Sequence, residues 1–182
     1  MLRESKKARS VRLAIIIDKL DAAYPDARVG LDFETPLQLL VATILSAQCT
    51  DVRVNLVTPV LFTRYPTPEA LANADAADVE DIIKSTGFFR AKTKSLLAMA
   101  RTLVAEFGGA VPRSLAELIT LGGVGRKTAN VVLGNAFNIN EGLVVDTHVQ
   151  RLSRRLGLTR EADAVAIEQA LIPLFPREAW TL

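Results

Sequence analysis

Leu121-Gly122-Gly123-Val124-Gly125-Arg126-Lys127 is a glycine-rich break between two stretches of helical pattern. Three glycines around one valine let the backbone bend tightly and approach a ligand closely. A helix is predicted to follow, from about Thr128 to Phe137. The first amides of a helix have no acceptor within it and carry the positive end of its dipole, so they suit a nucleic-acid phosphate without reading base sequence. The segment therefore predicts a hairpin between two helices.

Helical patterns cover almost all of the remaining chain, and no segment alternates polar and apolar residues as a strand would. Start signals are Thr35-Pro36, Asp51, Thr67-Pro68, Asp75, Ser114 and Asp146, and stop signals are Gly87, Gly108-Gly109 and Gly157. Long helices are predicted over about 10–24, 35–47, 91–107, 146–156 and 161–174. Pro59 falls inside the helix that follows Asp51 and is expected to kink it. The expected fold class is all-α.

The composition is that of a globular protein: 182 residues, 49% hydrophobic and 23% charged, are enough for a sizeable core. A net charge of +2 is too small to indicate a nucleic-acid partner by itself, but the charges are unevenly placed. Basic residues gather at Lys84, Arg90, Lys92, Lys94 and Arg101, and again at Arg151, Arg154 and Arg155. A solvated helix face explains either cluster equally well.

No apolar run approaches the roughly 18 residues that cross a membrane, and no signal segment is recognisable. The single cysteine, Cys49, rules out an internal disulfide and is compatible with a reducing cytoplasm. A cytoplasmic protein without a membrane partner is expected, associated with the nucleoid if the source is bacterial.

Several segments together resemble the endonuclease III family of helix-hairpin-helix DNA glycosylases. They are the hairpin with Thr128-Ala129, Val145-Asp146-Thr147-His148, Leu45-Ser46-Ala47-Gln48-Cys49-Thr50-Asp51 and Gly87-Phe88-Phe89-Arg90-Ala91-Lys92. The similarity covers roughly residues 10 to 175. It implies two helical lobes: a six-helix lobe over 29–142 that contains the hairpin, and a second lobe made of 1–28 and 143–182.

Lys127 and Asp146 match the catalytic lysine and aspartate of that family. The resemblance implies that the lysine attacks C1′ of a damaged nucleotide, displaces the base and forms a Schiff base that eliminates the 3′ phosphate. A free amine is required, so the site must disfavour the ammonium. Asp146 is expected to take a proton or to stabilise the positive sugar. Taken singly, the two residues are equally consistent with a lysine that clamps phosphate and a structural N-cap.

The resemblance also implies that Gln48 enters the gap left by an extruded base and that Phe88 wedges against the opposite strand. Core packing for Phe88 and a buried amide for Gln48 are the alternatives. His148, the only histidine, matches a position near the DNA backbone, and no metal site is expected. The full set of expected DNA contacts is Gln48, Phe88, Gly123, Val124, Gly125, Arg126, Thr128, His148 and Arg151.

The chain departs from the family pattern at two places. Gly122 stands where the family's hairpin usually has proline, which suggests a turn less ordered in advance for phosphate. Four cysteines that hold a 4Fe–4S cluster near the end of relatives are absent, so no cofactor is expected. Truncation of the second lobe is favoured over a cluster-free variant, because Trp180 would lack neighbours to bury it.

The sequence thus predicts a monomeric, bifunctional DNA glycosylase and abasic-site lyase of base excision repair, acting on double-stranded DNA. By resemblance its substrates are oxidised or ring-saturated pyrimidines, such as thymine glycol, and abasic sites. Lys127 favours the bifunctional class, since the family's adenine-removing relatives lack this lysine. The alternative is a truncated DNA-binding protein with weak or no activity. The exact damaged base and the base opposite it do not follow from the sequence.

Overall fold

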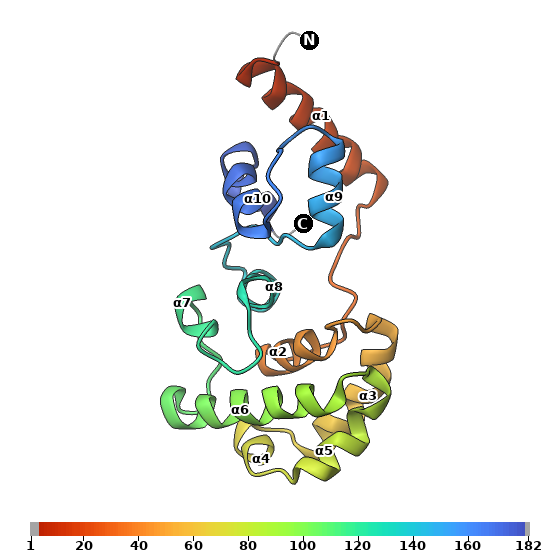
Figure 1. Cartoon of the computed structure of the whole chain (residues 1–182), viewed down its shortest axis with the longest axis vertical. Helices are drawn as coiled ribbons and strands as arrows, with labels where there is room; N and C mark the ends of the chain where they lie inside the picture. Colours follow the sequence, from red (N-terminus) through yellow and green to blue (C-terminus); the bar gives the residue numbers. More distant parts are fainter. Residues whose placement is uncertain (1–3, 181–182) are drawn as a thin grey trace. The chain divides into compact units, whose positions relative to one another are not determined.

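The computed structural model describes residues 4–180, and its regular structure in that range is helical, with no strand (Figure 1). The expected all-α fold is confirmed. The α-helices are α1 Lys6–Ala23, α2 Pro36–Leu45, α3 Asp51–Arg64, α4 Pro68–Ala72, α5 Ala76–Ile83, α6 Phe89–Phe107, α7 Leu115–Leu118, α8 Arg126–Phe137, α9 Thr147–Arg155 and α10 Ala164–Leu171. Short 3-10 turns are η1 Lys84–Thr86, η2 Ile172–Leu174 and η3 Arg177–Trp180.

The chain divides into two compact units. Unit 1 joins the two ends of the chain, up to Val29 and from Gly142, and unit 2 holds Gly30–Glu141. Unit 2 contains seven α-helices, α2 to α8, rather than the six expected, because the one-turn helices α4 and α7 both form.

Unit 2 is built around α2. Thr35 caps this helix by accepting a hydrogen bond from Gln38 N (3.2 Å), and Pro36 occupies its first position. Every side chain from Leu39 to Leu45 is buried, so the helix is enclosed by its neighbours. Helices α3, α6 and α8 pack around it, and α6 contacts α4 and α5 as well (Figure 1). The hairpin helix α8 therefore rests directly on the core of unit 2.

Unit 1 has its own apolar core, formed by Leu13 of α1 with Leu143, Val145, Leu158, Ile167 and Leu171. Trp180 packs against this core, and its indole nitrogen donates a hydrogen bond to Phe175 O (3.2 Å). The expectation that Trp180 lacks neighbours is therefore wrong.

Two helix ends differ from the sequence prediction. Thr50, not Asp51, caps α3, because its hydroxyl accepts from Arg53 N (3.3 Å) while Asp51 lies in the first turn. The last long helix begins later than predicted, after Asp163, whose carboxylate accepts from Val165 N and Ala166 N. Among residues 4–180 no helix has both the length and the apolar character needed to span a bilayer.

Candidate active-site residues in the two units

The glycine-rich turn between α7 and α8 lies directly against α6. A Cβ added at Gly122 would stand 2.8 Å from Ala98 Cβ and 3.1 Å from Met99 N. Gly123 has a φ of 76°, and a Cβ there would stand 2.6 Å from Ser95 Cβ. Both positions thus require glycine. Glycine at position 122, where the family's hairpin usually has proline, allows the turn to contact α6 directly.

The start of α8 has no side-chain cap. Gly125 occupies the N-cap position, and no side chain accepts a hydrogen bond from the first turn. Within residues 4–180 the only other α-helix of this kind is α6, which begins after Phe88. Serine, threonine or aspartate caps all the remaining α-helices described. A helix start without a side-chain cap, as at α8 and α6, suits an anion.

Lys127 is the second residue of α8, and its side chain is exposed. Gly123, Gly125 and Arg126 are exposed as well, whereas Thr128 is half-buried. Val124 differs from its expected role: its side chain is buried, and its amide donates to Leu121 O (3.1 Å). Val124 thus holds the turn together instead of offering an amide to a phosphate.

Asp146 is the N-cap residue of α9 in unit 1. One carboxylate oxygen, Oδ1, accepts a hydrogen bond from Val149 N (2.8 Å), and the side chain is half-buried. The neighbouring Val145 is buried in the core of unit 1. Its packing holds the backbone next to Asp146 in place. His148 and Arg151 are exposed on the same helix, and the Arg151 guanidinium donates to His148 Nδ1 (3.2 Å).

Gln48 and Phe88 share an unusual backbone. Their φ angles are 52° and 48°, and the only other described non-glycine residue with positive φ is Asn138. Asparagine tolerates this conformation at the end of a helix, and Asn138 is the C-cap residue of α8. A larger side chain in the left-handed region costs about 1–2 kcal/mol. Phe88 is 68% exposed and Gln48 is also exposed. Core packing for Phe88 and a buried amide for Gln48 are therefore both wrong.

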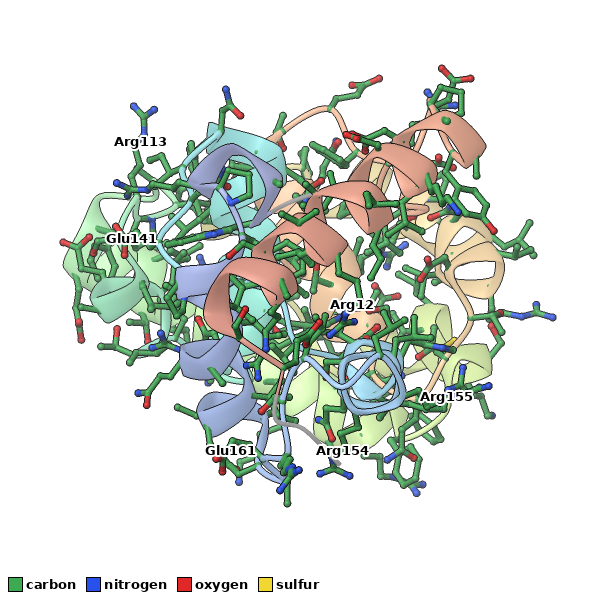
Figure 2. The ribbon with its side chains drawn as sticks, turned by 90° about the horizontal axis from the view of Figure 1, so that it is seen from above. Arg12, Arg113, Glu141, Arg154, Arg155 and Glu161 are labelled. Atoms are coloured by element: carbon green, nitrogen blue, oxygen red, sulfur yellow. The ribbon has the colours of Figure 1, made fainter. Side chains whose placement is uncertain are left out.

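The two basic clusters do not act as uniform surfaces. In the first, Lys92 is only 5% exposed, and its Nζ donates to Thr86 O (2.8 Å). Burial lowers the pKa of the Lys92 ammonium, and the Cys49 thiol opposes that shift. In the second, Arg154 Nε donates to Glu161 O (2.8 Å), so this side chain closes a loop of unit 1 (Figure 2). Sequence alone gave no signal for either assignment.

The residues of this chain do not fit an iron-sulfur cluster. Such a cluster needs several thiolates, and the chain has one cysteine, Cys49, which is partly exposed. Among the residues that the structure describes, no three histidine, cysteine, aspartate or glutamate side chains gather as metal ligands. No chemical step is therefore assigned to a metal or cluster.

The chain is similar in sequence and in structure to known proteins. Residues 41–177 match the HhH-GPD superfamily of base excision DNA repair proteins. Endonuclease III of Synechocystis is 56% identical over 176 residues, which are 97% of this chain and 79% of the relative. The solved structure of a non-covalent endonuclease III–DNA complex has a TM-score of 0.90 and 38% identity, covering 100% of this chain and 82% of that one.

A second solved structure, a trapped endonuclease III–DNA covalent intermediate, matches with the same TM-score of 0.90, identity of 38% and coverage of 100% and 82%. The sequence match spans most of the chain, and the structural match spans all of it. Both concern one family and one class of reaction. This chain therefore belongs to the endonuclease III family and is a DNA glycosylase/abasic-site lyase of base excision repair.

Proposed function

We propose that the chain removes oxidised or ring-saturated pyrimidines from double-stranded DNA and cleaves 3′ to the abasic site, with Lys127 as the nucleophile. The observation that carries this proposal is an exposed lysine at the second position of a helix whose N-terminus has no side-chain cap. A relative of 38% identity has been solved as a trapped covalent intermediate with DNA, which supports covalent chemistry in this family.

Lys127 would act first as an amine. Its nitrogen attacks C1′ of the damaged nucleotide, the bond to the base breaks, and the base leaves with the bonding electrons. The C1′–O4′ bond then breaks as the bound nitrogen loses a proton and O4′ takes one, which opens the sugar and leaves a Schiff base between C1′ and the lysine nitrogen. Loss of a proton from C2′ of this Schiff base expels the 3′ phosphate by β-elimination. The attack needs a free amine, and exclusion of water beneath the extruded nucleotide would disfavour the charged form.

Asp146 would supply the acid-base or electrostatic part of the reaction. Its Oδ1 is engaged by Val149 N, which orients the carboxylate at the start of α9. A carboxylate held in this way can take a proton or stabilise positive charge on the sugar without reorganising during the reaction. The N-cap role is therefore compatible with a catalytic role, because capping sets the direction of the side chain.

The two exposed residues with a left-handed backbone conformation, Gln48 and Phe88, would open the duplex and fill the gap left by the extruded base. Extruding a base costs a few kcal/mol, and a side chain already directed outward can fill the vacated stack. Phe88 and Gln48 are both exposed in this conformation, which supports wedge and gap-filling roles. Phosphates would be held by the exposed hairpin residues Gly123, Gly125 and Arg126 with Thr128, and by His148 and Arg151 of α9. The enzyme would act as a monomer.

Borohydride trapping on a duplex with one abasic site tests the assignment of Lys127. The unaltered chain is expected to form a covalent complex, and Lys127→Gln is expected to form none while binding the duplex almost as well. Lys19→Gln, the same change at an exposed lysine of α1, is the matched control and should trap normally. Full trapping by Lys127→Gln at saturating DNA would rule out the assignment. No trapping by the unaltered chain would instead favour a DNA-binding protein without lyase activity.

A further inference from the structure

Lys92 is the one buried cationic side chain among the residues that the structure describes. The other buried polar or charged side chains there are threonines, Asn130, Ser153 and Glu168. Lysines are almost never fully buried unless they are paired, so this position needs an explanation. The sequence suggests a lysine on a basic surface, but at 5% exposure Lys92 cannot hold a phosphate at the surface.

Lys92 donates two hydrogen bonds to the segment that presents Phe88. Its Nζ donates to Thr86 O (2.8 Å), and its backbone amide donates to Phe88 O (3.0 Å). The hydroxyl of Thr86 in turn donates to Ile83 O (2.8 Å), which ties the same turn to α5. Lys92 thus holds the residues on both sides of Gly87, the residue directly before Phe88.

Phe88 has a backbone conformation that its own side chain does not favour. Its φ of 48° and ψ of 27° are unfavourable for an aromatic residue, and its ring is 68% exposed. The ring is mostly exposed, so no free energy of burial offsets the backbone strain. Strained residues persist where the surrounding structure fixes them, and they concentrate at functional sites. The Lys92 ammonium fixes one end of this short turn at Thr86 O, and the first backbone hydrogen bond of α6, from the Lys92 amide to Phe88 O, fixes the other.

We propose that Lys92 is a positioning residue for base extrusion: its buried ammonium clamps Thr86 O and so keeps Phe88 directed outward before DNA binds. The inference rests on the wedge role proposed for Phe88. A wedge fixed in advance loses less conformational freedom on binding, so the benefit appears when the duplex is opened.

A double-mutant cycle with Lys92→Met and Phe88→Ala tests this inference. Methionine keeps the length and packing of the side chain but removes the donor. The measurements are the single-turnover rate of base removal from a thymine glycol duplex and the fluorescence of 2-aminopurine placed opposite the lesion. Cleavage of a single-stranded abasic oligonucleotide, which has no opposite strand to wedge, is the internal reference. Leu103→Val, a core change elsewhere on α6, controls for lost stability.

Each single variant is expected to slow the duplex reaction by about tenfold and to reduce the 2-aminopurine signal, with single-strand cleavage unchanged. The double variant should be no slower than the slower single variant, because both changes remove one function. Leu103→Val should leave all three readouts unchanged. If Lys92→Met does not fold, Lys92→Leu, which also lacks a donor, takes its place in the same cycle and is judged in the same way.

Three results would overturn the inference in different ways. If Phe88→Ala slows the duplex reaction but Lys92→Met does not, or if their effects multiply, Lys92 does not act through Phe88 and the wedge role still stands. If Phe88→Ala has no effect, the wedge role fails and the inference fails with it. Equal slowing of duplex and single-strand cleavage by Lys92→Met would assign Lys92 to general stability.

Discussion

Asp146 combines two functions in one side chain, and substitution can separate them. Asp146→Asn removes the negative charge but keeps an oxygen that can accept from Val149 N, and asparagine caps helices well. We expect base removal to slow by roughly 10² to 10⁴ fold, the usual contribution of a positioned acid-base group. The melting temperature should change little. Single-turnover kinetics and thermal unfolding measure the two effects.

Asp163→Asn provides a matched control, because Asp163 caps α10 in the same unit through Val165 N and Ala166 N. It should affect stability to a similar small degree and leave the rate of base removal unchanged. If both aspartate variants react at the rate of the unaltered chain, Asp146 is only a structural cap.

Lys92 should make stability depend on pH in a defined direction. Burial lowers the pKa of its ammonium in the folded chain, while in the unfolded chain the pKa is near the usual value of about 10.4. Between these two values the unfolded chain binds more protons, so the free energy of unfolding rises with pH; below the lower value the penalty is fully present. The unaltered chain should therefore gain stability relative to Lys92→Met as pH rises from neutral towards about 10.4.

Denaturant unfolding of both proteins at matched pH values measures this difference. Taking the difference cancels the groups that titrate alike in the two proteins. A constant difference over the alkaline range would show that the Lys92 ammonium carries no burial penalty, and a falling difference would show that its charge stabilises the fold.

At the level of elements, the hairpin turn should tolerate side chains very unequally. Gly122→Ala places a Cβ against Ala98 and the backbone of α6, so overpacking should destabilise the chain by about 1–3 kcal/mol. Gly125→Ala meets no atom within 4 Å and has a φ of −94°, so it should cost under about 1 kcal/mol. Denaturant unfolding compares the two. Equal costs would mean that the turn does not depend on its contact with α6.

The helices were largely predictable because their start signals are local. Thr35, Thr67, Ser114 and Asp146 each cap the helix predicted after them. Errors arose where two capping residues are adjacent, as at Thr50 and Asp51, or where the capping residue lies further along the chain than predicted, as with Asp163 of α10. The roles of Gly122 and Lys92 depend on contacts with α6 and Thr86, which no local pattern reveals.

For the whole molecule, charge distribution matters more than net charge. The chain carries only +2, and several of its basic residues serve the fold. Lys92 is buried, Arg154 bonds Glu161 O, and Arg101 Nε donates to Ala72 O (3.2 Å). Sequence showed where basic residues gather but not which are engaged in this way. Arg126, Lys127 and Arg151 are exposed, and they are the cations predicted to meet DNA.

These three cations predict how binding responds to salt. Each cation that neutralises a phosphate releases counterions, so three contacts should give a slope of about −3 in a plot of log affinity against log salt concentration. Fluorescence anisotropy with an abasic duplex measures that slope. Arg151→Gln should reduce its magnitude by about one. Arg160→Gln, at an exposed arginine outside the clusters, should leave it unchanged.

Because phosphate contacts carry no base information, undamaged duplexes of different sequence should share one slope. A dissociation constant that is the same at low and moderate ionic strength would exclude phosphate contact as the main source of affinity.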